Sequence, residues 1–378
     1  MKKVLLVIVL LLCPFSVFGK ELIPNSTSGI LIEAASGKVI YEKDINKEVS
    51  VASMTKMVAQ ILIMEEIENK KIKWTDVVTV SKNASEMGGS QIYLETGEKM
   101  TVEDLMKGIS VASGNDATVA MAEYISGSEE KFVKRMNAKV KELGLKNTHF
   151  TNCTGLDDKN HYSSSYDMSI IARELVVNHP DILKFSSIYE DYLRENTNRK
   201  FWLVNTNKLI MGYEGTDGLK TGHTDAAGYC LAATSKRNNV RLIAIVLGEK
   251  DSKIRNKETM ELLDYGFNNI KVKTLKKKGE LIERKSINKS ETGYVDVILK
   301  DDLNVAEDVD NKTKYQYDIV INDIQVPTKA NTIVGKIKVL NKSKVITEGD
   351  LITSFDLKKI SFLPYYKSNL KSIIFGNI

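Results

Sequence analysis

The stretch SVASMTKMVAQILIM, residues 50 to 64, decides how this chain folds and what chemistry it can perform. Nearly every position is apolar over a length typical of a helix, which predicts a buried helix. Ser53 and Lys56 nevertheless lie inside the run, three residues apart. A lysine in such a place loses hydration energy unless a partner holds it or it becomes neutral. The pair therefore marks a candidate site in the core.

The chemistry of this pair follows from helix geometry. Residues three apart lie on one face, so Lys56 can reach the Ser53 hydroxyl. Apolar neighbours should depress the pKa of Lys56, and a neutral lysine can accept the proton of a serine. Ser53 also lies near the helix start, where the macrodipole favours developing negative charge. Taken alone, the pair could equally be a capping serine and a lysine whose stem is buried while its ammonium reaches water.

Composition places the chain among ordinary globular proteins. Its 378 residues suffice for two or three domains, and 42% hydrophobic with 27% charged residues excludes wholesale disorder. The net charge of +5 is small, and the lysines are spread along the chain, so nucleic-acid binding has little support. Beyond the N-terminal segment only Cys153 and Cys230 remain, which we interpret as two separate buried thiols rather than a disulfide.

The N-terminus has the pattern of a secretory signal peptide over residues 1–19. A basic start, MKK, precedes the apolar run VLLVIVLLL, and small residues precede a plausible cleavage after Gly19. The run is too short for a comfortable transmembrane span. Cys13 raises the alternative of a lipid anchor, but Leu12 stands where a small residue is expected. We therefore expect an exported protein at the extracellular face of the cytoplasmic membrane or in the cell wall.

The middle of the chain predicts an α+β domain over residues 20–272. Segments 29–42 and 228–247 each contain two β-rich runs around a polar turn, which predicts two hairpins. An antiparallel sheet that joins the two ends of the region, with a helical insertion, fits this order. Helical patterns begin at Thr101 and at Ser128 (ending near Gly144) and cover 165–178 and 256–269.

Two smaller units are predicted to follow. After a charged, linker-like segment, KVKTLKKKGELIERK, alternating patterns predict a small β-sandwich-like domain over residues 273–357. Residues 358–378 predict an amphipathic helix on a membrane surface. The alternative is a helix that docks on its own β domain. The apolar face of the helix consists of Leu363, Tyr366, Leu370, Ile373 and Ile374.

Two further motifs follow Ser53-Met-Thr-Lys56: Ser113-Gly114-Asn115, and Lys220-Thr221-Gly222. Each is weak alone (SGN by itself suggests a turn and a helix cap), but the order and contexts ASMTKM, ASGNDA and DGLKTGHT make a strong signal. The set resembles the penicillin-recognising serine enzymes, most closely the low-molecular-mass D-alanyl-D-alanine carboxypeptidases. GGSQIYLETGE at 88–98 is similar to that family too. The resemblance spans about 25–270, and the β domain and tail fit the family's layout.

The resemblance implies a β-lactamase/transpeptidase-like fold and a set of catalytic roles. Ser53 would attack the carbonyl of the penultimate D-Ala in a peptidoglycan stem peptide, with Lys56 as general base. Ser113 would pass protons toward the leaving amine, and Asn115 would orient Lys56 and the substrate amide. The backbone N–H groups of Ser53 and His223 would form the oxyanion hole.

The third motif suits the substrate's terminal carboxylate. Lys220 and Thr221 can bind it, and the charge of Lys220 beside Lys56 should disfavour protonation of both lysines. Gly222 would let a substrate backbone approach an edge strand closely. The resemblance adds Arg255 as a further carboxylate-binding residue. Where the family often carries an arginine, this chain has Thr206, which affects details of substrate contact.

The four histidines support no competing mechanism. A Ser-His-Asp site of the G-x-S-x-G type and an HExxH zinc site are both missing from the sequence, and we expect neither metal nor cofactor. His161, in NHYSSSYD, resembles a family segment near the active site, and we interpret it as supporting the site, with a surface role as the alternative.

The sequence thus predicts a serine D-Ala-D-Ala carboxypeptidase that β-lactam antibiotics inhibit covalently. A β-lactamase would need a deacylating glutamate, and no E-x-x-L-N segment stands in a suitable place. A D,D-endopeptidase would use the same motifs and stays open. An inactive wall-binding scaffold is disfavoured because every motif residue is intact. The sequence does not distinguish a vegetative from a sporulation role, or identify the third stem-peptide residue.

Overall fold

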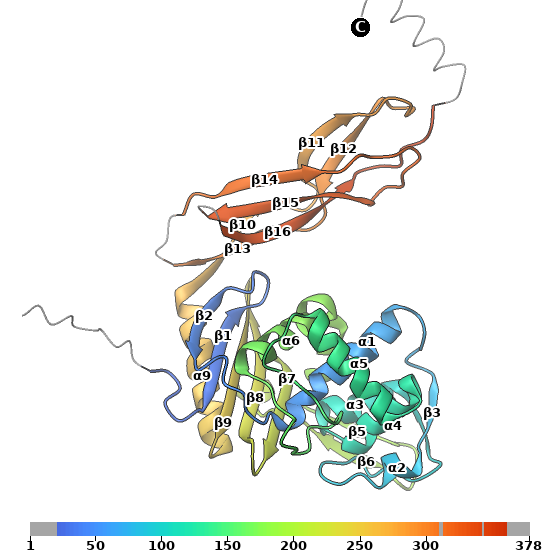
Figure 1. Cartoon of the computed structure of the whole chain (residues 1–378), viewed down its shortest axis with the longest axis vertical. Coiled ribbons are helices and arrows are strands. Elements are labelled where there is room, and N and C mark those ends of the chain that lie inside the picture. Colours follow the sequence, from blue (N-terminus) through green and yellow to red (C-terminus); the bar gives the residue numbers. More distant parts are fainter. Residues whose placement is uncertain (1–20, 310–312, 342–343, 361–378) are drawn as a thin grey trace, which may run out of the picture.

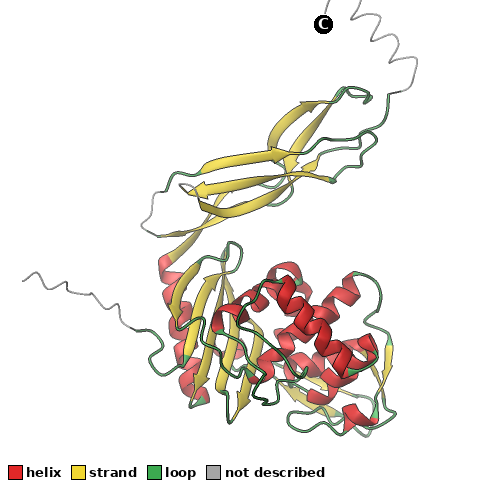
Figure 2. Cartoon of the chain, in the orientation of Figure 1, coloured by secondary structure: helices red, strands yellow, loops and turns green. Residues whose placement is uncertain are grey.

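The computed structural model describes residues 21–309, 313–341 and 344–360. The predicted signal peptide, and the predicted tail helix from residue 361 onward, lie outside the described residues. The elements up to helix α9 form one body, and strands β10 to β16 form a second (Figures 1 and 2). Among the described residues, no helix is both long enough and apolar enough to span a membrane.

A five-stranded antiparallel sheet in the order β2-β1-β9-β8-β7 organises the first body. Strand β1 pairs with β9, so that Ile30 lies opposite Ile245 and the two ends of the domain meet in one sheet. The predicted hairpins and the predicted sheet with a helical insertion are confirmed. The strands are β1 (Ser28–Glu33), β2 (Val39–Lys43), β7 (Thr216–Thr224), β8 (Gly228–Arg237) and β9 (Val240–Glu249).

Both faces of this sheet are covered because apolar side chains alternate along its strands. Ile243 and Ile245 belong to the core under the helical insertion, whereas Leu242 and Val246 belong to a second core under α9 (Ser252–Asn269). Successive side chains of a strand point to opposite faces, so the sheet is the middle layer of three. Figure 2 shows α9 on one side of the strands and the remaining large helices on the other.

The insertion consists of helices whose starts follow from capping residues. Thr101 accepts a hydrogen bond from the backbone N–H of Asp104, and Ser128 accepts one from that of Lys131. The helices predicted from Thr101, from Ser128 and over 165–178 are confirmed. The main helices are α1 (Lys56–Glu68), α3 (Val102–Val111), α4 (Asn115–Ser126), α5 (Glu129–Glu142) and α6 (Ser165–Asn178).

Short elements connect these helices and the sheet. They are the 3-10 turns η1 (Ala52–Thr55) and η2 (Pro180–Ile182), helices α2 (Lys82–Ser85), α7 (Leu183–Ser186) and α8 (Leu209–Gly212), and strands β3 (Val77–Thr79), β4 (Lys99–Thr101), β5 (Glu190–Leu193) and β6 (Phe201–Val204).

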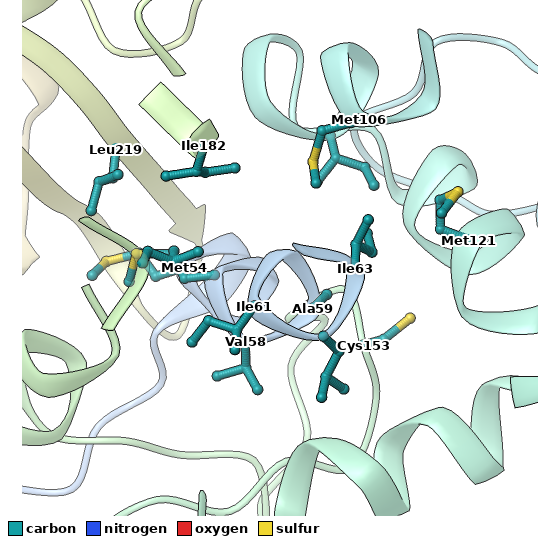
Figure 3. Packing of buried hydrophobic residues seen from close by; sticks show 14 of the residues in the cluster. Met54, Val58, Ala59, Ile61, Ile63, Met106, Met121, Cys153, Ile182 and Leu219 are labelled. Carbon is teal, nitrogen blue, oxygen red and sulfur yellow. The ribbon is translucent and has the colours of Figure 1, made fainter. Parts of the chain in front are cut away.

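Helix α1 runs through the centre of the insertion, as its all-round apolar sequence predicts. Figure 3 shows Met54, Val58 and Ile63 from this region among side chains of other elements, including Met106 and Leu219. All these side chains are buried. The start of the helix is therefore held by packing around Lys56, while the neighbouring Ser53 is only half-buried.

The second body is all β, but it starts earlier than its charged sequence suggests. The segment interpreted as linker-like forms most of β10 (Ile270–Lys276) and β11 (Leu281–Ser286). Most lysines of this segment are exposed. Ile270, the first residue of β10, is buried, and Leu275 packs on the core of the domain. The strands therefore have a buried side, which the many charged residues obscured in the sequence. The other strands are β12 (Tyr294–Leu299), β13 (Leu303–Asp308), β14 (Gln316–Ile321), β15 (Ile333–Asn341) and β16 (Lys344–Thr353).

Candidate active site

Ser53 lies in the 3-10 turn η1, directly before α1 rather than within it. This differs from the single helix expected from the sequence. Side chains three apart eclipse each other in a 3-10 turn, so the pair still meets. Lys56 Nζ is 2.8 Å from Ser53 Oγ. The turn starts at Ala52, whose φ of +47° is unusual for a residue with a side chain.

Lys56 is fully buried and has two further neighbours. Its Nζ donates to Oδ1 of Asn115 and to the backbone oxygen of Thr154, both at 2.6 Å. Burial lowers the pKa of Lys56 to about 7, against the opposing effects of Cys153 and Asp116. Near pH 7 a large fraction of Lys56 is therefore neutral, in line with the effect expected from its apolar neighbours.

Ser113 and Asn115 lie at the junction of α3 and α4, with Asn115 as the first residue of α4. Ser113 has φ +63°, a left-handed conformation that turns the chain sharply between the two helices. Its Oγ is buried and, within the described part of the chain, has no hydrogen-bond partner. A buried hydroxyl without a partner costs free energy, so this group is available to a ligand.

The segment that starts at Gly88 holds the start of α4 in place. Asn115 donates from Nδ2 to the Gly88 oxygen and from its backbone N–H to the Ser90 oxygen, both at 2.7 Å. The buried carboxylate of Asp116 accepts from the backbone N–H groups of Ile92 and Leu94. The similarity of residues 88–98 to the family thus has a structural basis that the sequence alone did not reveal.

The third motif lies inside the edge strand β7, which directly precedes β8 in the chain. The structure also supplies a different reason for Gly222: a Cβ there would lie 2.6 Å from the Val51 oxygen, so the glycine admits the turn that carries Ser53. His223 follows with its ring stacked on Tyr229 at 4.0 Å. Among the residues that the structure describes, β8 is the only strand that pairs with β7, so the outer edge of β7 is open to a substrate backbone.

Lys220 is buried behind the site, and its Nζ donates to the Thr221 oxygen at 2.8 Å. Its pKa lies well below the usual range because of burial and then because of the charges of Lys56 and Arg255. The two lysines were expected to lower each other's pKa. The charge of Lys56 does lower the pKa of Lys220, whereas the pKa of Lys56 is lowered mainly by burial.

A cavity of about 460 Å³ connects these elements. Its cationic side chains are Lys208 and Arg255, and none of the described residues that line it is acidic. Such a lining suits an anionic ligand. The lining consists of Ser53, Ser90, Ser113, Val204, Asn205, Thr206, Lys208, Thr221, Gly222, His223, Tyr229, Ser252, Arg255 and Asn256.

Two of the expected carboxylate-binding residues line this cavity. Thr221 Oγ1 donates to Thr206 Oγ1 at 2.7 Å, so two hydroxyls lie side by side in the cavity lining. Arg255 reaches the cavity from α9, where its Nε and Nη2 donate to Oδ1 of Asn256 at 3.1 and 2.8 Å. Burial lowers the pKa of Arg255.

His161 supports the nucleophile's turn from behind. Its Nδ1 accepts from the backbone N–H of Thr151 at 3.2 Å, so Nε2 carries the proton and donates to Thr55 Oγ1 at 2.7 Å. Burial lowers the pKa of His161 to about 4, which keeps the ring neutral. This position agrees with the supporting role expected from the sequence. The two cysteines are separate buried thiols, as predicted.

Sequence reasoning missed the loop formed by residues 151–156, which supplies the Thr154 oxygen. Oδ1 of Asn152 accepts from the backbone N–H groups of Thr154 and Gly155, which closes the loop on itself. Gly155 has φ +86°, and a Cβ there would overlap the carbonyl oxygen of Ala52. The Asn152 and Gly155 spacing, typical of an Asx turn, is the signal that could have indicated it.

A serine beside a buried lysine of lowered pKa, at a helix start next to an antiparallel sheet, defines a serine acyl-transfer enzyme of the transpeptidase-like α+β class. The family described as D-alanyl-D-alanine carboxypeptidase matches residues 20–251, and the penicillin-binding protein 5 C-terminal domain matches residues 271–359. The chain belongs to the D-alanyl-D-alanine carboxypeptidase family and is a serine-type D-Ala-D-Ala carboxypeptidase of peptidoglycan metabolism.

Curated relatives are similar along most of the chain. It is 44% identical over 355 residues to the D-alanyl-D-alanine carboxypeptidase DacF of Bacillus subtilis, covering 93% of this chain and 90% of that protein. It is 33% identical over 347 residues to DacA of Escherichia coli K12, covering 89% and 85%.

Solved structures share the architecture. Penicillin-binding protein 5 of Haemophilus influenzae has a TM-score of 0.70 at 30% identity, covering 89% of this chain and 98% of that one. Penicillin-binding protein D2 of Listeria monocytogenes, in its ampicillin-bound form, has a TM-score of 0.58 at 29% identity, covering 64% and 97%.

Replacing Gly155 by alanine tests the contact between the loop and the nucleophile's turn. We expect Gly155→Ala to lose about 1 to 3 kcal/mol more stability than Gly144→Ala, and to react more slowly with a fluorescent penicillin, because its Cβ displaces Ala52. Gly144 is the matched control: its φ is also positive, at +71°, but a Cβ there meets nothing within 4 Å. Equal unfolding temperatures and labelling rates in the two variants would contradict the contact's importance.

Proposed function

We propose that Ser53 is the nucleophile that removes the terminal D-Ala from peptidoglycan stem pentapeptides through a covalent acyl-enzyme. The observation that carries this proposal is the placement of Lys56, which is buried within 2.8 Å of Ser53 Oγ and has a pKa near 7. A base with a pKa close to ambient pH is well suited to take a proton in the transition state.

The contacts of Lys56 determine which way the proton moves. A neutral lysine amine has two N–H groups and one lone pair. The oxygens of Asn115 and Thr154 can only accept, so they engage the two N–H groups. The lone pair then faces the third neighbour, Ser53, whose hydroxyl can donate. Both acceptors thus orient Lys56 as the base.

The reaction follows from this arrangement. Ser53 Oγ bonds to the carbonyl carbon of the penultimate D-Ala as its proton passes to Lys56, and the backbone N–H groups of Ser53 and His223 stabilise the oxyanion. The C–N bond then breaks, and the leaving amine takes a proton from Lys56 through Ser113, whose unpartnered hydroxyl lines the cavity. Water hydrolyses the ester and restores Ser53. A penicillin would acylate Ser53 in the same way.

The cavity supplies the binding groups for the substrate. Thr221, Thr206 and Arg255 can bind the terminal carboxylate, with Lys208 as a second cation in the lining. Lys220 does not line this cavity and acts through its hydrogen bond to the backbone oxygen of Thr221. The open edge of β7 can pair with the substrate backbone, which would then extend past Gly222 and His223.

Replacing the nucleophile is the direct test. Ser53→Ala should lose labelling by fluorescent penicillin and lose release of D-Ala from diacetyl-Lys-D-Ala-D-Ala, with activity reduced by roughly a thousandfold or more. Ser50→Ala is a suitable control, because the Ser50 hydroxyl donates a hydrogen bond to the exposed Asp157 and takes no part in the proposed reaction. Labelling that persists in Ser53→Ala would refute the assignment. A parallel assay on cross-linked muropeptides measures any endopeptidase activity.

The pH dependence of acylation tests the role of Lys56. Below its pKa the amine is protonated and cannot accept the serine proton, so the acylation rate should fall as pH decreases, with a midpoint near pH 7. The second-order rate constant with a penicillin, measured between pH 5 and 9, gives this profile. A rate that stays constant across this range would contradict a neutral Lys56 base.

We further propose that the chain is exported and held at the membrane. Residues 1–19 carry the signal-peptide pattern, and the catalytic domain extends from residue 20 to the end of α9. The β domain begins with β10 at Ile270 and includes residues 358–360, because Ile360 donates to the Lys289 oxygen. The remainder of the predicted tail lies on the membrane surface. The domain division is supported by the two family matches and by the separate sheets of the two bodies. The membrane contact is supported by the apolar face in the sequence of the tail.

The tail can be tested without disturbing any described contact. Deleting residues 361–378 should move the protein from the membrane fraction to the soluble fraction while penicillin labelling persists. A variant with Leu370→Asp and Ile373→Asp keeps the length and breaks the apolar face, so it should behave like the deletion. Retention of both variants in the membrane fraction would refute this anchor.

A further inference from the structure

The orientation of Lys56 depends on a backbone oxygen in a loop without regular secondary structure. Thr154 supplies this oxygen, and residues 151–156 belong to neither a helix nor a strand. Asn152 closes the loop internally. An internal turn gives the loop its shape but does not determine where it lies relative to Lys56. A contact from a rigid element is needed to place it.

Glu129 on α5 provides that contact. Its Oε1 accepts from the backbone N–H of Cys153 at 3.2 Å and from the Cys153 thiol at 3.3 Å. Burial raises the pKa of Cys153 well above its usual range, with Glu129 adding to the effect, so the thiol keeps its proton and can donate it. One carboxylate oxygen therefore holds two groups of the residue directly before Thr154.

Helix α5 is a suitable anchor for this oxygen. Glu129 is its first residue, where the helix dipole favours a negative charge, and Ser128 caps the helix. Phe132 and Met136 fix α5 in the main core, because both side chains are buried. The position of the Glu129 carboxylate is thus tied to the packed interior.

We propose that Glu129 is a positioning residue for the acylation step, holding Cys153 so that the Thr154 oxygen engages one N–H of Lys56. The proposal rests on the function assigned above to Ser53 and Lys56. Without this acceptor, Lys56 can turn an N–H toward Ser53 Oγ in place of its lone pair. The base would then be present but misdirected, and misplacement of a reacting group by a small distance strongly reduces rate.

Three substitutions at Glu129 separate this role from a general effect on folding. Glu129→Ala removes the acceptor, Glu129→Asp withdraws it by one methylene while keeping the charge, and Glu129→Gln keeps an oxygen that can accept from both groups. Glu130→Ala is the matched control on the same helical turn, since Glu130 is exposed and pairs with Lys134. The measurement is the rate of Ser53 acylation by a penicillin, followed by intact mass from pH 5 to 9, with the thermal unfolding temperature recorded for each variant.

We expect the plateau rate of Glu129→Ala and Glu129→Asp to fall by about tenfold or more. Glu129→Gln and Glu130→Ala should stay within about threefold of the parent, because the first keeps the acceptor and the second touches neither the loop nor Lys56. In Glu129→Ala the midpoint of the pH profile should also move to lower pH, since the ammonium form of Lys56 loses an acceptor. A purely structural role would lower the unfolding temperature without moving this midpoint.

Either of two results overturns the inference: an unchanged plateau rate in Glu129→Asp, or an unchanged midpoint in folded Glu129→Ala. If Glu129→Ala does not fold, the comparison of Glu129→Asp with Glu129→Gln decides. The parent and Ser53→Ala are measured together, so a parent protein that is not acylated at Ser53 refutes the proposed function itself. A parent acylated at Ser53 with unaffected Glu129 variants refutes only the positioning role.

Discussion

The site depends on one buried amine held between two oxygens. Lys56 has no access to water, and its pKa near 7 follows mainly from that burial. Asn115 and Thr154 each accept from it at 2.6 Å, which leaves Ser53 as the remaining neighbour. Desolvation makes the lysine a base, and the two acceptors give that base its direction.

Most of the surrounding structure can be understood as support for this arrangement. Helix α1 is buried from Lys56 to Met64, which excludes water from its first residue (Figure 3). The segment from Gly88 holds Asn115, and the loop around Asn152 presents Thr154. Glycines at 155 and 222 let this loop and strand β7 approach the Ser53 turn more closely than any larger residue would allow. The supports come from parts of the chain far apart in sequence.

Local patterns predicted a large part of the fold, because they reflect local physics. Capping at Thr101 and Ser128 and the period of residues 165–178 identified helices, and paired β runs identified the main sheet. Where charge masked alternation, as in β10 and β11, the interpretation as a linker was wrong. The lysines lie on the exposed faces of those strands. The buried faces can be identified only from the packing of the folded domain.

The sequence by itself determined which groups could react: a serine and a lysine one turn apart, with the SGN and KTG segments to complete the site. It also predicted that the lysine would be desolvated, because apolar residues surround it in the chain, but only the structure excluded the alternative in which the ammonium reaches water. Only the tertiary structure decided the contacts of Lys56 with Thr154 and of Cys153 with Glu129, and the reason for Gly222. Those contacts join residues about 25 to 170 positions apart or use backbone atoms, which carry no signature in the sequence.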